Sequence, residues 1–165
     1  MENLEEVELD MPAGCNLILG YSHFIKTVED LEEILKTYIP KAPYSISFSE
    51  ASGERLIRFE SNDEELEKAG IENLLKLKCG HTFLILIREA FPITVLNAIK
   101  GCQEVGSVFA ATANPISAVV FRGRNGGSVL GVVDGFSPLG VETEADKTKR
   151  RSLLRMGKQD WNANI

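Results

Sequence analysis

The chain has 165 residues, of which 44% are apolar and 25% charged, and its formal net charge is −6. This length suits one well-buried core, and the excess of acidic side chains argues against nucleic acid, whose phosphates need Lys and Arg. No apolar stretch approaches the roughly 20 residues that span a bilayer, so we expect no membrane partner.

The first residues are acidic, whereas a secretory signal begins with positive charge and an apolar run. We therefore expect a cytoplasmic protein with one domain over residues 1–165. Within it we expect an N-terminal strand or arm at 1–13, a core at 14–157 and a tail at 158–165. The three cysteines form no C-x-x-C pair, and we interpret them as small buried hydrophobic residues: Cys15, Cys79 and Cys102.

The first half of the chain predicts a strand, a helix, a hairpin and a second helix. Residues 15–25 form an apolar strand, and Thr27 is a natural N-cap for a helix that Pro40 ends. The alternation in YSISFSE predicts a strand with one polar face, paired through the turn ASGE with RLIRFES. Ser61 and Glu64 resemble a capping box for a helix through about Leu77.

The second half predicts a buried strand from His81 and a helix from Pro92 to about Lys100. Two apolar strands, VGSVFAAT and SAVVF, follow, and an Asn-Gly-Gly hairpin leads into SVLGVVDG. A charged helix covers about 142–156. We therefore expect an α/β protein of the α+β kind, with a mixed sheet of about seven strands and about four helices packed on it.

A histidine and an anion-binding helix start occur together at SHFIKT. The first amides of a helix are unpaired and favour a phosphate, here near Lys26 and Thr27. His23 precedes Lys26 by three residues and could act as a general base or as a phosphoryl nucleophile. From its position alone, a core histidine with both ring nitrogens paired is equally consistent.

Polar residues also interrupt or follow the later strands. His81 begins a buried strand, and Arg88 lies at its far end, where an ion pair and a substrate clamp are both consistent. Asp134 ends a strand and could bind a metal or a hydroxyl, although an Asx turn is the simpler interpretation. Asn114 is held extended by the following proline, which also suits an ordinary loop.

Missing motifs exclude several functions. The chain has no G-x-x-x-x-G-K-[ST] loop, and its glycine-rich GRNGG lies in a hairpin rather than between a strand and a helix. Ordinary P-loop and Rossmann sites are therefore excluded. Two histidines without H-x-x-x-H spacing argue against a zinc hydrolase.

Four segments in this order resemble the adenosine-specific kinase family: GYSHFIKT, GHTFLILIREAFPITVLNAIK, ATANP and LGVVDGFSPLGVE. The resemblance extends from about Gly14 to Arg155. It implies a phosphotransferase acting on adenosine or AMP, with a phosphohistidine intermediate as one mechanism. It also implies a homo-oligomer, with a trimer as one candidate, and a phosphate donor such as ATP.

The family motifs contain the candidate site residues, to which Thr27 is added from the helix start, and the roles that follow are our hypotheses. His23, His81 and Asp134 are the candidate catalytic residues, and Asp134 is also the candidate ligand for Mg²⁺. The candidate nucleotide and phosphate ligands are Lys26, Thr27, Arg88, Asn97 and Asn114. We place the phosphoryl group on His23, with His81 as the rival, and the alternative function is binding or sensing of AMP or adenosine without turnover.

Overall fold

The computed structural model describes residues 3–155, so the expected tail at 158–165 lies outside the described residues. Contacts within the chain define two compact units, residues 1–135 and 136–165, which we describe separately. The described residues form eight strands and four α-helices, which confirms the α+β class. The strands are β1 Leu4–Glu8, β2 Cys15–Ser22, β3 Tyr44–Ser49, β4 Ile57–Ser61, β5 Thr82–Arg88, β6 Val105–Thr112, β7 Ile116–Arg122 and β8 Gly127–Asp134.

The strands form two antiparallel sheets instead of the single mixed sheet that we expected. The larger sheet has the order β4-β3-β5-β2-β6, and the smaller has the order β1-β7-β8. In the middle of the larger sheet, Ile46 of β3 pairs with Ile85 of β5, which pairs with Ile18 of β2. These isoleucines are fully buried and fix the register, because a shift of one residue would move each strand's side chains to the opposite face of the sheet.

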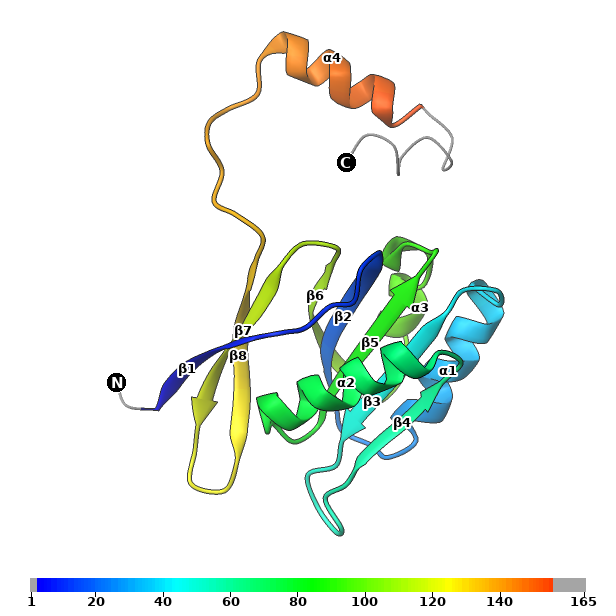
Figure 1. Cartoon of the computed structure of the whole chain (residues 1–165), viewed down its shortest axis with the longest axis vertical. Helices are drawn as coiled ribbons and strands as arrows, with labels where there is room; N and C mark the ends of the chain where they lie inside the picture. The colour runs from blue at the N-terminus through cyan, green and yellow to red at the C-terminus, as the bar shows by residue number, and fades with distance from the viewer. Residues whose placement is uncertain (1–2, 156–165) are drawn as a thin grey trace. The chain divides into compact units, whose positions relative to one another are not determined.

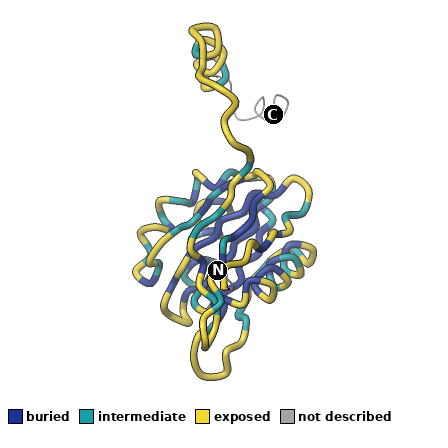
Figure 2. The backbone as a smooth tube through the Cα atoms, turned by 90° about the vertical axis from the view of Figure 1, so that its left-hand side faces the viewer, coloured by how far each residue is buried: buried dark blue, intermediate teal, exposed yellow. Residues whose placement is uncertain are grey.

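Helices α1 Thr27–Tyr38, α2 Glu64–Leu77 and α3 Leu96–Lys100 cover the two faces of the larger sheet (Figure 1). One core joins this sheet to α1 and α3, and the other joins its opposite face to α2 and the smaller sheet. In Figure 2 the buried residues follow the strands between these layers. The larger sheet is therefore covered on both faces, as its apolar strands require.

The polar face of the first hairpin lies under a helix. Ser45 and Ser47 of β3 are fully buried, because α2 packs across them. The helix passes closely enough that a Cβ on Gly70 would lie 2.7 Å from the Ser47 hydroxyl oxygen. The period-two pattern of serines was thus correctly assigned to a strand with one polar face, and this face is buried under α2.

Three helix starts also differ from expectation. Lys26, not Thr27, is the N-cap of α1. Asp63, not Ser61, caps α2, and its carboxylate accepts a hydrogen bond from the Leu66 amide. Pro92 begins a short 3₁₀ turn, η1 Pro92–Thr94, before α3, so one continuous helix is not formed.

The second unit contains α4 Glu144–Leu153, shorter than expected. Its capping box joins Thr143 and Asp146, and no residue of the helix is buried. No described helix, α4 included, is both long and apolar enough to cross a membrane.

Gly20 in β2 is required by packing. An added Cβ would lie 2.2 Å from the Phe83 ring and 2.7 Å from the Ser107 carbonyl oxygen. We expect Gly20→Ala to lower the free energy of unfolding by about 2–3 kcal/mol, because the Phe83 ring is fully buried in the core and the Ser107 carbonyl belongs to the paired strand β6. Urea unfolding measures this change. The control is Gly131→Ala in β8, where a Cβ meets open space, and equal losses in both variants would contradict the packing argument.

Candidate active site

The two histidines lie at the same end of the larger sheet. His23 directly follows β2, and His81 directly precedes β5, its antiparallel neighbour. The amide of Ser22 donates a hydrogen bond of 2.9 Å to the carbonyl oxygen of His81. Residues 58 positions apart in the sequence are therefore brought to adjacent strand ends.

The imidazole of His23 is held in one tautomer. Its Nδ1 lies 2.9 Å from the carbonyl oxygen of Glu104, which also accepts the His23 amide at 3.2 Å. A carbonyl oxygen only accepts, so Nδ1 carries the proton and the neutral ring keeps its lone pair on Nε2. His23 is exposed. This is the arrangement that a nitrogen nucleophile needs, and it excludes the buried, doubly paired core histidine.

The start of α1 is fixed by hydroxyl groups rather than by a side-chain cap. The buried hydroxyl of Thr27 donates to the Phe24 carbonyl and lies 2.5 Å from the Ser22 hydroxyl, which donates to Glu104 O at 3.1 Å. Lys26 is exposed and pairs with Asp30 at 2.5 Å. Lys26 is close to His23 in sequence, but its ammonium group is held by a carboxylate of its own helix.

His81 adopts an unusual backbone conformation. Its φ is +57°, and its amide donates to Ser49 O at 2.7 Å, so it forms a turn and is not the first strand residue that we expected. Its ring stacks on Phe48 at 6.0 Å between centroids and contacts the Tyr21 ring edge-on at the same separation. A non-glycine residue in the left-handed region is strained, and the two backbone hydrogen bonds and the aromatic contacts hold it there.

Three polar residues that sequence reasoning missed form a cluster joined to His23 through Glu104. The ligand atoms of Asp30, Cys102 and Glu104 lie within 4.8 Å of one another. Cys15 and Cys79 are buried as predicted, but Cys102 is only partly buried and lies among carboxylates. Burial and the Glu104 carboxylate together raise the pKa of the Cys102 thiol to about 12.

The remaining predicted residues lie elsewhere. Arg88 ends β5 at the opposite end of the sheet, where it pairs with Glu65 at 2.7 Å and with Asp63 at 3.4 Å. Asp134 accepts hydrogen bonds from the Thr112 hydroxyl at 2.7 Å and from the Asn114 amide at 3.1 Å, also at that end. Strand β5 separates the two ends by about 20 Å. Asn97 is exposed on α3.

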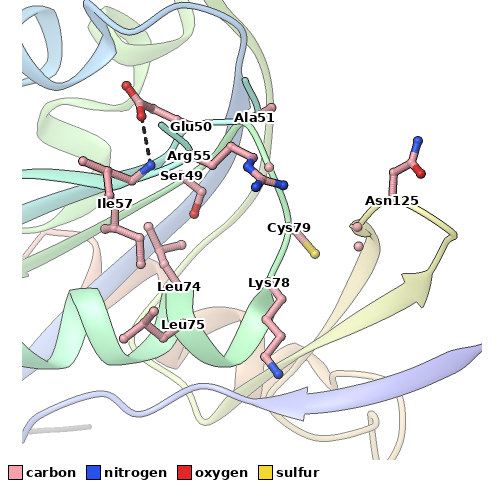
Figure 3. Close-up of a pocket in the computed structure, with 14 residues that line it drawn as sticks. Ser49, Glu50, Ala51, Arg55, Ile57, Leu74, Leu75, Lys78, Cys79 and Asn125 are labelled. Carbon is pink, nitrogen blue, oxygen red and sulfur yellow. Dashed lines mark hydrogen bonds between the residues drawn. The ribbon is translucent and has the colours of Figure 1, made fainter. Parts of the chain in front are cut away.

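A cavity of about 600 Å³ adjoins the His81 turn (Figure 3). Its lining comes from the β3–β4 hairpin, the end of α2 with the following turn, and the loop before β8. The lining includes Ser49, whose carbonyl accepts the His81 amide, and Gly80, which directly precedes His81. Arg55 and Lys78 also line it, both at positive φ, and neither forms an ion pair with a described residue. The cavity is large enough for a nucleoside and presents cationic groups to it.

Comparison with family models decides the identity of the chain. The model of the adenosine specific kinase family matches residues 7–158. The chain belongs to this family. The match covers both histidines, the cavity and the Asp30–Cys102–Glu104 cluster.

A solved structure supports the fold. The chain is 37% identical to the PH1918 protein from Pyrococcus horikoshii OT3, with a TM-score of 0.88 over 92% of this chain and 94% of that one. No curated protein matches the sequence. The fold is therefore shared with that archaeal protein.

The cluster predicts the reactivity of Cys102. We expect the native, metal-free protein to alkylate at Cys102 more than about tenfold more slowly at pH 8 than the urea-unfolded protein, because burial and the Glu104 carboxylate raise the pKa of the native thiol. Iodoacetamide labelling with peptide mass mapping measures the rate. Glu104→Gln should react faster than the wild type, since it removes a carboxylate that opposes the thiolate. Native alkylation at the unfolded rate would contradict this assignment.

Proposed function

We propose that the protein transfers a phosphoryl group from a nucleoside triphosphate such as ATP to adenosine, through His23. Family membership supports the adenosine-specific kinase-like function. The observation that carries the choice of His23 is its ring geometry: Nδ1 donates to the Glu104 carbonyl, and Nε2 belongs to an exposed side chain. The ring of His81 is engaged by two aromatic rings instead.

In the first step, Nε2 of His23 attacks the terminal phosphorus of the donor. An N–P bond forms, the bond from that phosphorus to the bridging oxygen breaks, and the nucleoside diphosphate leaves. The positive charge that develops on the ring is stabilised by the Nδ1–H bond to the Glu104 carbonyl. In the second step the adenosine 5′-hydroxyl oxygen attacks the same phosphorus, the N–P bond electrons return to Nε2, and the hydroxyl proton passes to solvent.

We place the nucleoside in the cavity beside the His81 turn. Its cationic residues, Arg55 and Lys78, suit a nucleotide phosphate, and its apolar residues Leu74 and Leu75 suit a base. A second hollow of about 390 Å³ near Asp134 is lined by Glu6 and Glu8. Those carboxylates would repel a phosphate. The first cavity also has one carboxylate, Glu50, but it is paired with Arg58 at 2.8 Å, so the first cavity is favoured.

The residues at the far end of the sheet require a second copy of the chain if they contribute to the same site. Arg88, Asn114 and Asp134 are too distant from His23 within one chain. The homo-oligomer implied by the family resemblance therefore stays a prediction. Light scattering would measure the oligomeric state. Asp134 as a ligand for Mg²⁺ also stays a prediction, and Oδ1 of Asp134 is already held by two hydrogen-bond donors.

Phosphohistidine formation tests the proposal. We expect the wild-type protein incubated with ATP to gain the mass of one phosphoryl group, which mild acid removes, and His23→Gln to gain none. His81→Gln is the matched control and should retain the gain. Intact mass spectrometry measures all three.

Three outcomes would overturn the mechanism in different ways. A gain that survives in His23→Gln but not in His81→Gln would assign the nucleophile to His81. Tight AMP binding by calorimetry, with neither adduct nor turnover, would establish the alternative of binding or sensing. Failure to bind adenosine, AMP or ATP would overturn both functions.

The cavity has its own test. We expect Arg55→Gln to weaken AMP binding about threefold to tenfold and to change adenosine binding little, because only AMP carries the phosphate charge. The control, Arg124→Gln, removes an exposed arginine from the nearby β7–β8 loop that does not line the cavity. Isothermal titration measures both affinities. Equal effects of the two variants on AMP would exclude a phosphate at Arg55.

A further inference from the structure

The Asp30–Cys102–Glu104 cluster contains a buried carboxylate oxygen that makes no well-formed hydrogen bond to a described residue. Glu104 is 6% exposed, and its Oε1 has no hydrogen-bond partner among the described residues. Buried acceptors without partners are rare, because each loses its hydration without compensation. The oxygen belongs to a group that already faces a second carboxylate and a thiol.

The donor set indicates which ligand could satisfy it. Two carboxylates and a thiol repel an anion and offer a cation three ligands of mixed hard and soft character. Mg²⁺ prefers oxygen ligands alone, whereas Zn²⁺ accepts thiolate and carboxylate together. With bonds of about 2.0–2.3 Å, ligands of a tetrahedral zinc lie about 3.3–3.8 Å apart, so atoms within 4.8 Å need to approach by only about 1 Å.

We propose that Asp30, Cys102 and Glu104 bind a divalent cation of the zinc class, with the fourth position open. The three ligands come from the first turn of α1 and the turn before β6. The Glu104 carbonyl accepts from the Ser22 hydroxyl, which lies 2.5 Å from the Thr27 hydroxyl at the start of α1, so the two segments are linked. Binding would displace the ammonium of Lys26 from Asp30. The metal site does not rest on the proposed phosphoryl transfer. If both proposals are correct, metal binding would free the Lys26 ammonium from Asp30, so that it could pair with a phosphate beside His23.

Zinc binding to chelator-treated protein tests the site. We expect isothermal titration with ZnCl₂ to give one site per chain, weakened at least tenfold in both Cys102→Ser and Glu104→Gln. Glu33→Gln, an exposed carboxylate on the same helix, is the control and should bind as the wild type does. Co²⁺ in place of Zn²⁺ should give the ultraviolet charge-transfer band of a thiolate ligand, absent in Cys102→Ser.

Folding of each variant is checked by circular dichroism, and the isosteric Glu104→Gln keeps the test valid if Cys102→Ser unfolds. Absence of zinc binding by the wild type would overturn the proposal. So would zinc binding that is unchanged in both folded variants, or that is lost only in His23→Gln. Displacement of Zn²⁺ by equimolar Mg²⁺ would also overturn it, because it would indicate an oxygen-only site. No nucleotide is present, so the result is independent of phosphoryl transfer.

Discussion

The carbonyl oxygen of Glu104 accepts three hydrogen bonds, from the His23 amide, the His23 Nδ1 and the Ser22 hydroxyl. It joins the end of β2 to the turn before β6, and through Ser22 and Thr27 to the start of α1. Each bond contributes about 1 kcal/mol, but their larger effect is geometric. They determine which nitrogen of His23 carries the proton, and the proposed chemistry depends on that choice.

The antiparallel order of the sheet explains why the predicted site residues separate. The sequence places functional residues at the ends of β2 and β5, both of which lead into helical turns. In a parallel sheet such ends share one edge, but β2 and β5 run in opposite directions. His23 therefore meets His81 at the beginning of β5, whereas Arg88 at its end lies at the other edge. Strand direction is set by long-range pairing, which a local pattern does not contain.

Much of the fold followed from local pattern. The apolar periodicity located the strands from β2 to β8 and the helices, and the class was correct. Local pattern did not show that α2 covers Ser45 and Ser47, because that contact joins distant segments. It also gave Ser61 as the cap of α2, where the structure has Asp63. The left-handed backbone of His81 was also missed, since nothing local distinguishes it from a strand residue.

Within the candidate site, single residues were predictable but their combinations were not. His23 was recognisable from a helix start and from the family motif. Asp30 and Glu104 are 74 positions apart, and each alone resembles an ordinary surface acid. The one sequence signal for the cluster was that Cys102 lies in a polar turn, two residues before Glu104.

The position of Glu104 connects the two proposals physically. Its main chain orients the proposed nucleophile, while its side chain belongs to the cluster with Asp30 and Cys102. A cation bound to that carboxylate would pull on the same short turn that supplies the carbonyl to His23. The Nδ1 hydrogen bond weakens steeply with distance and angle. Small movements of this turn would therefore change how strongly the imidazole of His23 is held in the tautomer that has its lone pair on Nε2. If both proposals hold, occupancy of the cluster and nucleophilicity of His23 would be coupled through one residue, without any contact between the metal and the imidazole.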